Sequence, residues 1–297
     1  LILFMVHALF DNSHGTQPEV VVDDVFPEGI VAMDYAAEDR TLVIATGSGH
    51  LIKLSQSGEQ LVRERGFSGV ESLVWSDAGT LGAAAMANGQ LVCFDSKLNS
   101  KWQVDVTANL LGLAVSPFGS HFAVSTELGR VHIVTSDRRE LCSFETPQPL
   151  QHLQLLSESP LMIGAAEFGH LCCHDLKGKE QWNVRIMNNV GDMATSGAGE
   201  RILLAAFNHG IQVLDGSGQQ EGSFMIDGVP NRIAAAQNGR RLAATTLENR
   251  LYWLGFDGNL LWAADMSADP VYCMAVSPLA DRLFIATQSG RLLQLLW

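Results

Sequence analysis

The stretch GHLIKLSQSGEQ at residues 49–60 returns in the same shape as GQLVCFDSKLNS from residue 89, GRVHIVTSDRRE from residue 129 and GHLCCHDLKGKE from residue 169. One apolar residue near the start of this phrase marks each copy: Leu51, Leu91, Val131, Leu171, Ile211, Leu251 and Leu292. Successive markers are 40, 40, 40, 40, 40 and 41 residues apart. A repeat of this length predicts one supersecondary unit that is used seven times.

Three further positions keep the same register. Eighteen residues before each marker the residue is apolar: Met33, Leu73, Leu113, Leu153, Met193, Ile233 and Met274. Six residues before it the residue is small: Ala45, Ala85, Ser125, Ala165, Ala205, Thr245 and Ala286. Two residues before it stand Gly49, Gly89, Gly129, Gly169, His209, Asn249 and Gly290. The last position is typical of a hairpin turn with positive φ.

Within one unit, turn residues separate four short apolar runs. In the third copy these are LLGLAVS (110–116), HFAVST (121–126), RVHIVT (130–135) and LCSFET (141–146). Strands without alternating polar faces are buried on both sides, as in a blade covered by its neighbours. The sequence therefore predicts an all-β, seven-bladed propeller of four-stranded antiparallel blades. We expect the blades near residues 27–66, 67–106, 107–146, 147–186, 187–226, 227–266 and 267–297.

The last copy ends at Trp297 and has no fourth strand of its own. The strand-like stretch PEVVVDDVF (18–26) precedes the first unit, and we expect it to pair with the last strand and close the ring. Closure would remove an exposed sheet edge. This divides the chain into an apolar extension, residues 1–17, and one propeller, residues 18–297.

The extension begins with LILFMVHALF, which is too short to cross a bilayer, since a span needs about 20 apolar residues. The chain does not begin with Met, which predicts trimming at its left end. Two interpretations stay open: the stump of a signal or anchor helix, or a segment that packs on the propeller. Five cysteines without a disulfide or zinc spacing favour buried free thiols in the cytoplasm. Export or anchoring through a trimmed N-terminal segment is the alternative.

The chain is acidic, with a formal net charge of −13 and a pI near 5.0. It has only 19 Lys and Arg residues in 297, and they form no run. Because neutralising phosphates takes clustered cations, this composition argues against nucleic-acid partners. It also argues against anionic membranes, except through a segment N-terminal to the propeller.

Some phrases resemble known propeller families. HDLKGKEQW (174–182), FDSKLNSKW (94–102) and LGFDGNLLW (254–262) are similar to pyrroloquinoline-quinone-like repeats of bacterial type, whereas AVSPFG (114–119) and AVSPLA (275–280) resemble the first turn of WD repeats. The resemblance implies the fold. Quinone-binding members carry eight blades, a cofactor and calcium, whereas this chain has seven copies, so we expect no cofactor and no metal. Asp95, Asp175 and Asp215 are better explained as caps of tight turns.

No HExxH, GxSxG, P-loop or dinucleotide fingerprint is present, and every unit keeps nearly the same length. Both features favour a protein that is not an enzyme. The leading hypothesis is a monomeric interaction scaffold that binds a partner protein or peptide through loops on one rim. The alternative is a propeller that binds or senses a small molecule at the mouth of its central channel.

The rim candidate lies directly before each marker, at His50, Gln90, Arg130, His170, Gly210, Arg250 and Arg291. Its five basic members are His50, Arg130, His170, Arg250 and Arg291, which predict a cationic ring that seats an acidic peptide. Solvated hairpin ends that tolerate any polar residue are the alternative.

The channel candidate lies nineteen residues before the marker, where three consecutive copies carry His152, Asp192 and Arg232. Asn189 and Asn231 stand in neighbouring loops. Such a group could bind a polar ligand at the channel mouth or support acid–base chemistry. The alternative is that these side chains satisfy one another where inner strands crowd together.

Overall fold

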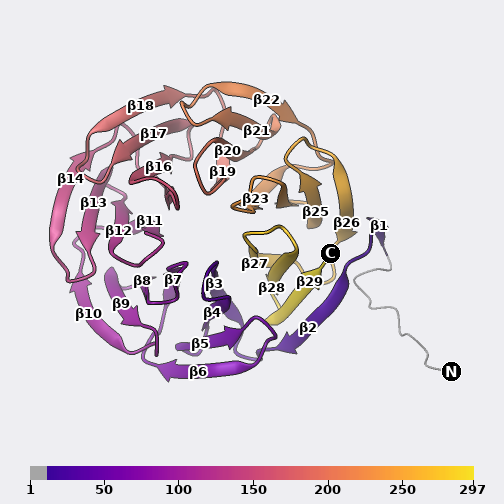
Figure 1. Cartoon of the computed structure of the whole chain (residues 1–297), viewed down its shortest axis with the longest axis horizontal. Helices are drawn as coiled ribbons and strands as arrows, with labels where there is room; N and C mark the ends of the chain where they lie inside the picture. Colours follow the sequence, from indigo (N-terminus) through magenta and orange to yellow (C-terminus); the bar gives the residue numbers. More distant parts are fainter. Residues whose placement is uncertain (1–11) are drawn as a thin grey trace.

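The computed structural model describes residues 12–297 and contains seven sheets arranged in a ring around a central channel (Figure 1). Within each sheet the strands are antiparallel, and we call them A to D from innermost to outermost. They follow chain order in every sheet except the one that β2 completes. The predicted fold class, a seven-bladed β-propeller, is confirmed. In residues 12–297 no helix is long and apolar enough to span a membrane.

The first four blades follow one another along the chain. Blade 1 contains β3 (Ile30–Ala36), β4 (Thr41–Thr46), β5 (His50–Ser55) and β6 (Gln60–Arg65). Blade 2 contains β7 (Val70–Trp75), β8 (Leu81–Met86), β9 (Gln90–Asp95) and β10 (Ser100–Asp105). Blade 3 contains β11 (Leu110–Val115), β12 (His121–Thr126), β13 (Arg130–Thr135) and β14 (Glu140–Glu145). Blade 4 contains β15 (His152–Leu155), β16 (Leu161–Ala165), β17 (His170–Asp175) and β18 (Glu180–Arg185).

The remaining blades include strands from both ends of the described chain. Blade 5 contains β19 (Val190–Thr195), β20 (Arg201–Ala206), β21 (Gly210–Asp215) and β22 (Gln220–Phe224). Blade 6 contains β23 (Pro230–Ala235), β24 (Arg241–Thr246), β25 (Arg250–Gly255), β26 (Leu260–Asp265) and the short β1 (Ser13–Gly15). Blade 7 contains β27 (Val271–Val276), β28 (Arg282–Thr287), β29 (Arg291–Leu296) and β2 (Glu19–Val25).

Burial explains the sequence pattern of each strand. All six residues of β4 are buried, because B strands have a blade on either side, whereas the outer strand β14 alternates exposed and half-buried residues. The column of small residues lies in the B strands and is at most 4% exposed. Its two polar members bond to inner strands: the Ser125 hydroxyl accepts from the Gly112 N–H at 2.8 Å, and the Thr245 hydroxyl donates to Asn231 at 2.7 Å.

The hairpins between B and C strands require positive φ. Five glycines of the predicted column and Asn249 adopt it, with φ of 82° at Gly49 and 62° at Asn249. Blade 5 differs, because the positive φ lies one residue later, at Gly210, and His209 does not supply it. These hairpins and the connections from one D strand to the next A strand lie on one side of the ring, the hairpin face. The A–B and C–D turns form the turn face.

The N-terminal strand β2 completes blade 7 by pairing with β29, so the predicted closure is confirmed (Figure 1). The pairing contains a bulge between Val20 and Val22. The same irregularity occurs in the outer pair of blade 3, between Ile133 and Val134, and in those of the other blades. The closing strand therefore adopts the register of an ordinary D strand.

The chain segment just before β2 joins blade 6 to blade 7. β1 pairs with β26, the Thr16 N–H donates to the Leu261 carbonyl at 2.9 Å, and the Trp297 indole donates to the Thr16 carbonyl at 2.9 Å. Trp297 also stacks on Trp253 at 4.8 Å between ring centroids. Residues 12–17 of the predicted extension thus contribute to the seam; the apolar stretch 1–11 lies outside the described residues.

Outer-strand tryptophans connect neighbouring blades. The Trp102 indole donates to the Ser136 carbonyl and the Trp182 indole to the Gly216 carbonyl, both at 2.9 Å, and each acceptor belongs to the C–D turn of the next blade. Trp262, the third of this set, is fully buried and its indole N–H has no partner among the described residues. In blade 7, β29 leads to Trp297 instead of such a turn, and Trp297 packs edge-on against Trp262 at 5.6 Å.

The cysteines are all free, as expected. Cys172 packs in the core between blades 3 and 4, and Cys173 in the core between blades 4 and 5, because adjacent strand residues point to opposite faces. Burial raises the thiol pKa of Cys172 to about 12 and that of Cys173 to about 11. Both therefore stay protonated and serve as core side chains.

Replacing Trp297 with alanine tests the seam. We expect Trp297→Ala to lower the free energy of unfolding by about 3 kcal/mol, because a large ring and its hydrogen bond to Thr16 are lost. Hydrogen exchange should accelerate in β1 and β2, since these strands are held at the seam. Trp182→Ala, the control, should accelerate exchange in blades 4 and 5 only. Unchanged exchange in β2 after Trp297→Ala would contradict this account of closure.

Candidate functional site

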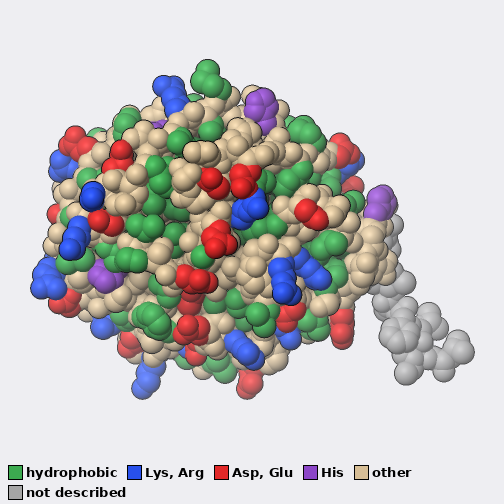
Figure 2. Space-filling view, turned by 45° about the horizontal axis from the view of Figure 1, so that its top comes forward, with side chains coloured by type: hydrophobic (Ala, Val, Ile, Leu, Met, Phe, Trp, Pro, Cys, Tyr) green, Lys and Arg blue, Asp and Glu red, His purple; other side chains and the backbone are tan. Residues whose placement is uncertain are grey.

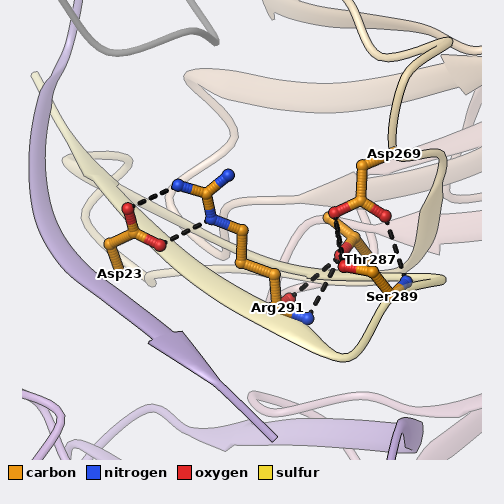
Figure 3. Close-up of polar contacts among 5 residues, drawn as sticks. All are labelled: Asp23, Asp269, Thr287, Ser289 and Arg291. Atoms are coloured by element: carbon orange, nitrogen blue, oxygen red, sulfur yellow. Dashed lines mark hydrogen bonds and ion pairs between the residues drawn. The ribbon is translucent and has the colours of Figure 1, made fainter. Parts of the chain in front are cut away.

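The three arginines of the rim column lie on the hairpin face, and each pairs with a carboxylate. Arg291 lies in β29 and forms a bidentate ion pair with Asp23 of the closing strand (Figure 3). Its Nε and Nη2 each lie 2.6 Å from an Asp23 carboxylate oxygen. Arg130 contacts Glu145 at 2.9 Å, and Arg250 pairs with Asp227. Asp23 raises the pKa of Arg291, so this guanidinium stays charged. The charge of each arginine in this column is therefore balanced by a neighbouring carboxylate. The role of the column in partner binding stays a prediction.

The two rim histidines have different surroundings. His50 is half-buried, and its Nδ1 lies 2.9 Å from the Ser48 hydroxyl. His170 is only 7% exposed, and its Nε2 has no partner in residues 12–297. Burial lowers the pKa of His170, so its ring is neutral at physiological pH. The rim column is thus less cationic than its composition alone indicates.

Register shifts in the A–B pairing accompany the channel-mouth column in every blade except blade 4, which carries His152. In blades 5, 6 and 7 the A–B pairing shifts at Gly191, Asn231 and Tyr272, directly before the column position. Such bulges redirect the next side chain. His152 and Asp192 are brought together, with 3.3 Å between Nδ1 and Oδ1. Asp192 also accepts the Ile233 N–H at 3.0 Å, so it links the inner strands of blades 5 and 6.

The other mouth residues do not join this pair. Arg232 is exposed and lies over the Tyr272 ring, 5.6 Å from its centroid. Asn231 is held by the Thr245 hydroxyl at 2.7 Å. Asn189 is exposed in the connection between blades 4 and 5. The mouth therefore contains a His–Asp pair and, apart from it, a cation resting on an aromatic ring; its role as a ligand site stays a prediction.

A second carboxylate, missed in the sequence, lies deeper in the channel. Asp34 of β3 accepts the Trp75 N–H at 2.6 Å and the Tyr35 N–H at 2.8 Å. Removal from bulk water raises its pKa to about 7, although the two N–H donors act in the opposite direction. Asp34 spans the inner strands of blades 1 and 2 as Asp192 spans those of blades 5 and 6. Near neutral pH it exists in both protonation states.

Asp34 lines a cavity on the channel axis. The cavity has two adjoining lobes of about 250 Å³ and 230 Å³, which share Asp34, Gln154, Asp77 and Gln237 among their lining residues. The side-chain amide of Gln154 has no hydrogen-bond partner among the described residues. Seventeen residues before the marker stand Asp34, Val74, Ala114, Gln154, Ala194, Ala234 and Ala275. Asp34 and Gln154 are the only polar members of this column, and this departure from Val and Ala is the sequence signal that could have located the cavity.

The turn-face end of the channel is held together across its axis. Asp77 accepts the Gln237 amide at 3.0 Å and the Ser157 hydroxyl at 3.2 Å, and these residues come from the A–B turns of blades 2, 6 and 4. Main-chain bonds link neighbouring turns as well, such as the Gly197 N–H to the Gln237 carbonyl at 2.9 Å. Burial raises the pKa of Asp77, and the two donors partly offset this effect.

Three hairpins of the hairpin face share a feature that was also missed. Each places a glutamate beside a large apolar residue in the turn: Glu127–Leu128, Glu167–Phe168 and Leu247–Glu248, on blades 3, 4 and 6. All six side chains belong to exposed residues. Two of the glutamates fix the adjoining connection, since Glu127 accepts the Asn109 amide at 2.8 Å and Glu248 the Val229 N–H at 2.8 Å.

Other groups have structural explanations. Asp95, Asp175 and Asp215 each accept main-chain N–H groups two and four residues ahead, at 2.8–3.0 Å, which confirms their role as turn caps. In residues 12–297 no three His, Cys, Asp or Glu side chains are grouped so that they could hold a metal ion. Lys and Arg side chains are interspersed with Asp and Glu on the face shown in Figure 2, which displays no broad basic area.

No protein-family model and no curated protein matches this chain. The geometry of the two candidate sites therefore has to indicate the function by itself.

Asp34→Asn tests the carboxylate in the channel. The folded protein holds the Asp34 proton up to a pH of about 7, whereas the unfolded chain releases it near the ordinary aspartate pKa of 3.8. The unfolded state therefore binds fewer protons in this window, and stability falls as pH rises through it. We expect the variant to gain stability relative to the parent by up to about 4 kcal/mol between about pH 4 and pH 8.

The measurement is denaturant unfolding of both proteins across that pH range. Asp24→Asn, which alters an exposed carboxylate on the closing strand, is the control and should follow the parent at every pH. A constant difference between Asp34→Asn and the parent, independent of pH, would show that Asp34 has an ordinary pKa.

Proposed function

We propose that this propeller is a non-enzymatic interaction scaffold whose hairpin face binds a segment of a partner protein. The observation that carries the proposal is the placement of exposed apolar side chains. Of the thirteen large exposed ones in residues 12–297, seven lie on the hairpin face: Val25, Leu128, Phe168, Met187, Met225, Leu247 and Tyr272. In the same part of the chain, Phe118 and Leu279 lie in turns of the opposite face, and Leu61, Leu141 and Leu260 stand at the starts of outer strands that begin at that face.

These apolar residues follow one another around the ring. Leu128 lies on blade 3, Phe168 on blade 4, Met187 between blades 4 and 5, and Met225 between blades 5 and 6. Met187 is 90% exposed and Leu128 76%, which is costly in water unless a partner covers them. Single exposed apolar residues are ordinary, but a succession of them over consecutive blades is typical of an interaction surface.

The charges of this face define the chemistry of the partner. The rim arginines are already paired, so they favour an acidic peptide less than their number alone indicates. Glu127, Glu167 and Glu248 have no arginine partner in the described part of the chain and stand directly beside apolar residues. Electrostatic complementarity then favours a segment that alternates basic and apolar side chains. We propose such a segment as the partner.

Two further points belong to the proposal. The regular spacing of Trp102, Trp182 and Trp262, with two indoles bonded to the next blade, supports kinship with pyrroloquinoline-quinone-like repeats. The turn-capping Asp95 and Asp175 in the same phrases support it too. Five free thiols favour a reducing compartment such as the cytoplasm.

The test is selection of binding peptides from a random display library against the full chain. We expect enrichment of peptides that combine Lys or Arg with Leu or Phe. The variant Leu128→Ser/Phe168→Ser/Leu247→Ser should weaken their binding at least about tenfold, because it removes the central apolar contacts. Raising the ionic strength should weaken binding further, since the face contributes charges exposed to solvent.

Phe118→Ser/Leu279→Ser is the matched control, because it removes two equally exposed apolar residues from the turn face. It should leave peptide binding unchanged. Enrichment of acidic peptides that need Arg130, Arg250 and Arg291 would instead favour the cationic rim. Peptides that bind the triple variant and the parent equally well would refute the proposed surface.

A further inference from the structure

A cavity that shares no residue with the hairpin-face surface remains without a role. It lies on the channel axis, between the mouth formed by His152 and Asp192 and the linked turns around Asp77. Its two lobes, about 250 Å³ and 230 Å³, together reach the size of small-molecule pockets, which begin near ~300 Å³. The space suits a small metabolite and is too small for a folded partner.

The walls of the cavity are strongly polar. Each A strand pairs on one side only, so its other edge turns unpaired N–H and C=O groups toward the axis. Asp34 and Asp192 take up two of these N–H groups, those of Trp75 and Ile233. In addition, Thr195 lines one lobe, is only 3% exposed, and has a hydroxyl with no partner among the described residues.

The ionisable side chains that line the cavity are acidic, and no basic side chain of the described residues lies among them to balance their charge. Asp34 and Asp77 line both lobes, and no Lys, Arg or His of residues 12–297 lines either one. The basic side chains of the mouth are engaged elsewhere, since His152 contacts Asp192 and Arg232 rests on Tyr272. A ligand that enters this space meets carboxyl and amide oxygens without a competing cation.

From these observations we infer that the channel binds a small hydrophilic amine, with the ammonium group placed between Asp34 and Gln154. Each Asp34 oxygen accepts one main-chain N–H and retains acceptor capacity for another donor. An ammonium has three donors, which match the Asp34 carboxylate, the Gln154 amide oxygen and the main-chain carbonyls. Hydroxyl or amide groups elsewhere in the ligand would pair with the remaining polar edge of the inner strands.

Binding would be linked to pH. Because burial raises the pKa of Asp34 to about 7, a bound ammonium must displace the Asp34 proton into solvent before the charge pair forms. Affinity should therefore rise several-fold between about pH 6 and pH 8. The other titratable groups that face the site are Asp77 and Tyr35 in the wall, with His152 and Asp192 at the mouth.

The test compares amines with alcohols of the same skeleton on the full chain. The probes are ethanolamine against ethylene glycol, putrescine against 1,4-butanediol, and glucosamine against glucose, each up to about 10 mM at constant ionic strength. Binding to the native state raises the melting temperature in proportion to ln(1 + [L]/Kd). We expect at least one amine to stabilise the protein and its paired alcohol to have a much smaller effect.

Two variants locate the response. Asp34→Asn removes the charge, and Gln154→Leu removes the amide without disturbing any hydrogen bond of the described structure. Each should weaken amine binding about tenfold or more, the effect of losing a hydrogen bond to a charged group. Asp24→Asn controls for general attraction of cations to an acidic protein and should respond like the parent.

Absence of stabilisation by every amine, or a response that persists in both Asp34→Asn and Gln154→Leu, would overturn the inference. A response that does not strengthen with pH would also contradict the ammonium–Asp34 pair. The triple variant of the hairpin face should keep its amine response, because Leu128, Phe168 and Leu247 lie outside the channel. Failure of the peptide test and failure of the amine test are therefore independent results.

Discussion

Ring closure is the constraint on which this structure depends. A blade buries the faces of its B and C strands only between two neighbours, so seven repeats in a row would leave two blades half-covered. The ring closes because β2, from the N-terminal part of the chain, pairs with β29 and forms the outer strand of blade 7. Two further contacts stabilise this junction: β1 pairs with β26 of blade 6, and the Trp297 indole donates a hydrogen bond to the Thr16 carbonyl.

The seam differs from the other blade junctions for a simple physical reason. Elsewhere an indole on the outer strand donates to the C–D turn of the next blade, as Trp102 does to Ser136. Blade 7 has no such turn, because its C and D strands, β29 and β2, are not consecutive in the chain. Trp297 fills the space with ring contacts to Trp253 and Trp262, and the Trp262 N–H has no partner in the described residues.

The repeat made the architecture predictable, whereas the candidate sites were predictable only in part. Columns of apolar, small and turn-forming residues identify the strands, and the strand from residues 18–26 was placed by counting one missing strand. His152 and Asp192 could be paired from their column because neighbouring blades bring equal positions together. The ion pairs of Arg130, Arg250 and Arg291 were not foreseen, since their partners come from positions in outer strands and connections that carry no repeat signature.

Asp34 shows where functional information lies in a protein of this kind. A strict repeat would give the channel seven equivalent walls of Val and Ala, and nothing in such a wall would prefer one ligand to another. Asp34 and Gln154 break this column on blades 1 and 4, while Asp77, Ser157 and Gln237 break another at the turn face. The second set satisfies itself with hydrogen bonds, which explains it as structure. The Gln154 amide has no such partner among the described residues, and each Asp34 oxygen retains acceptor capacity beside the one N–H that it accepts. This unused hydrogen-bonding capacity is the feature on which the proposed amine site depends.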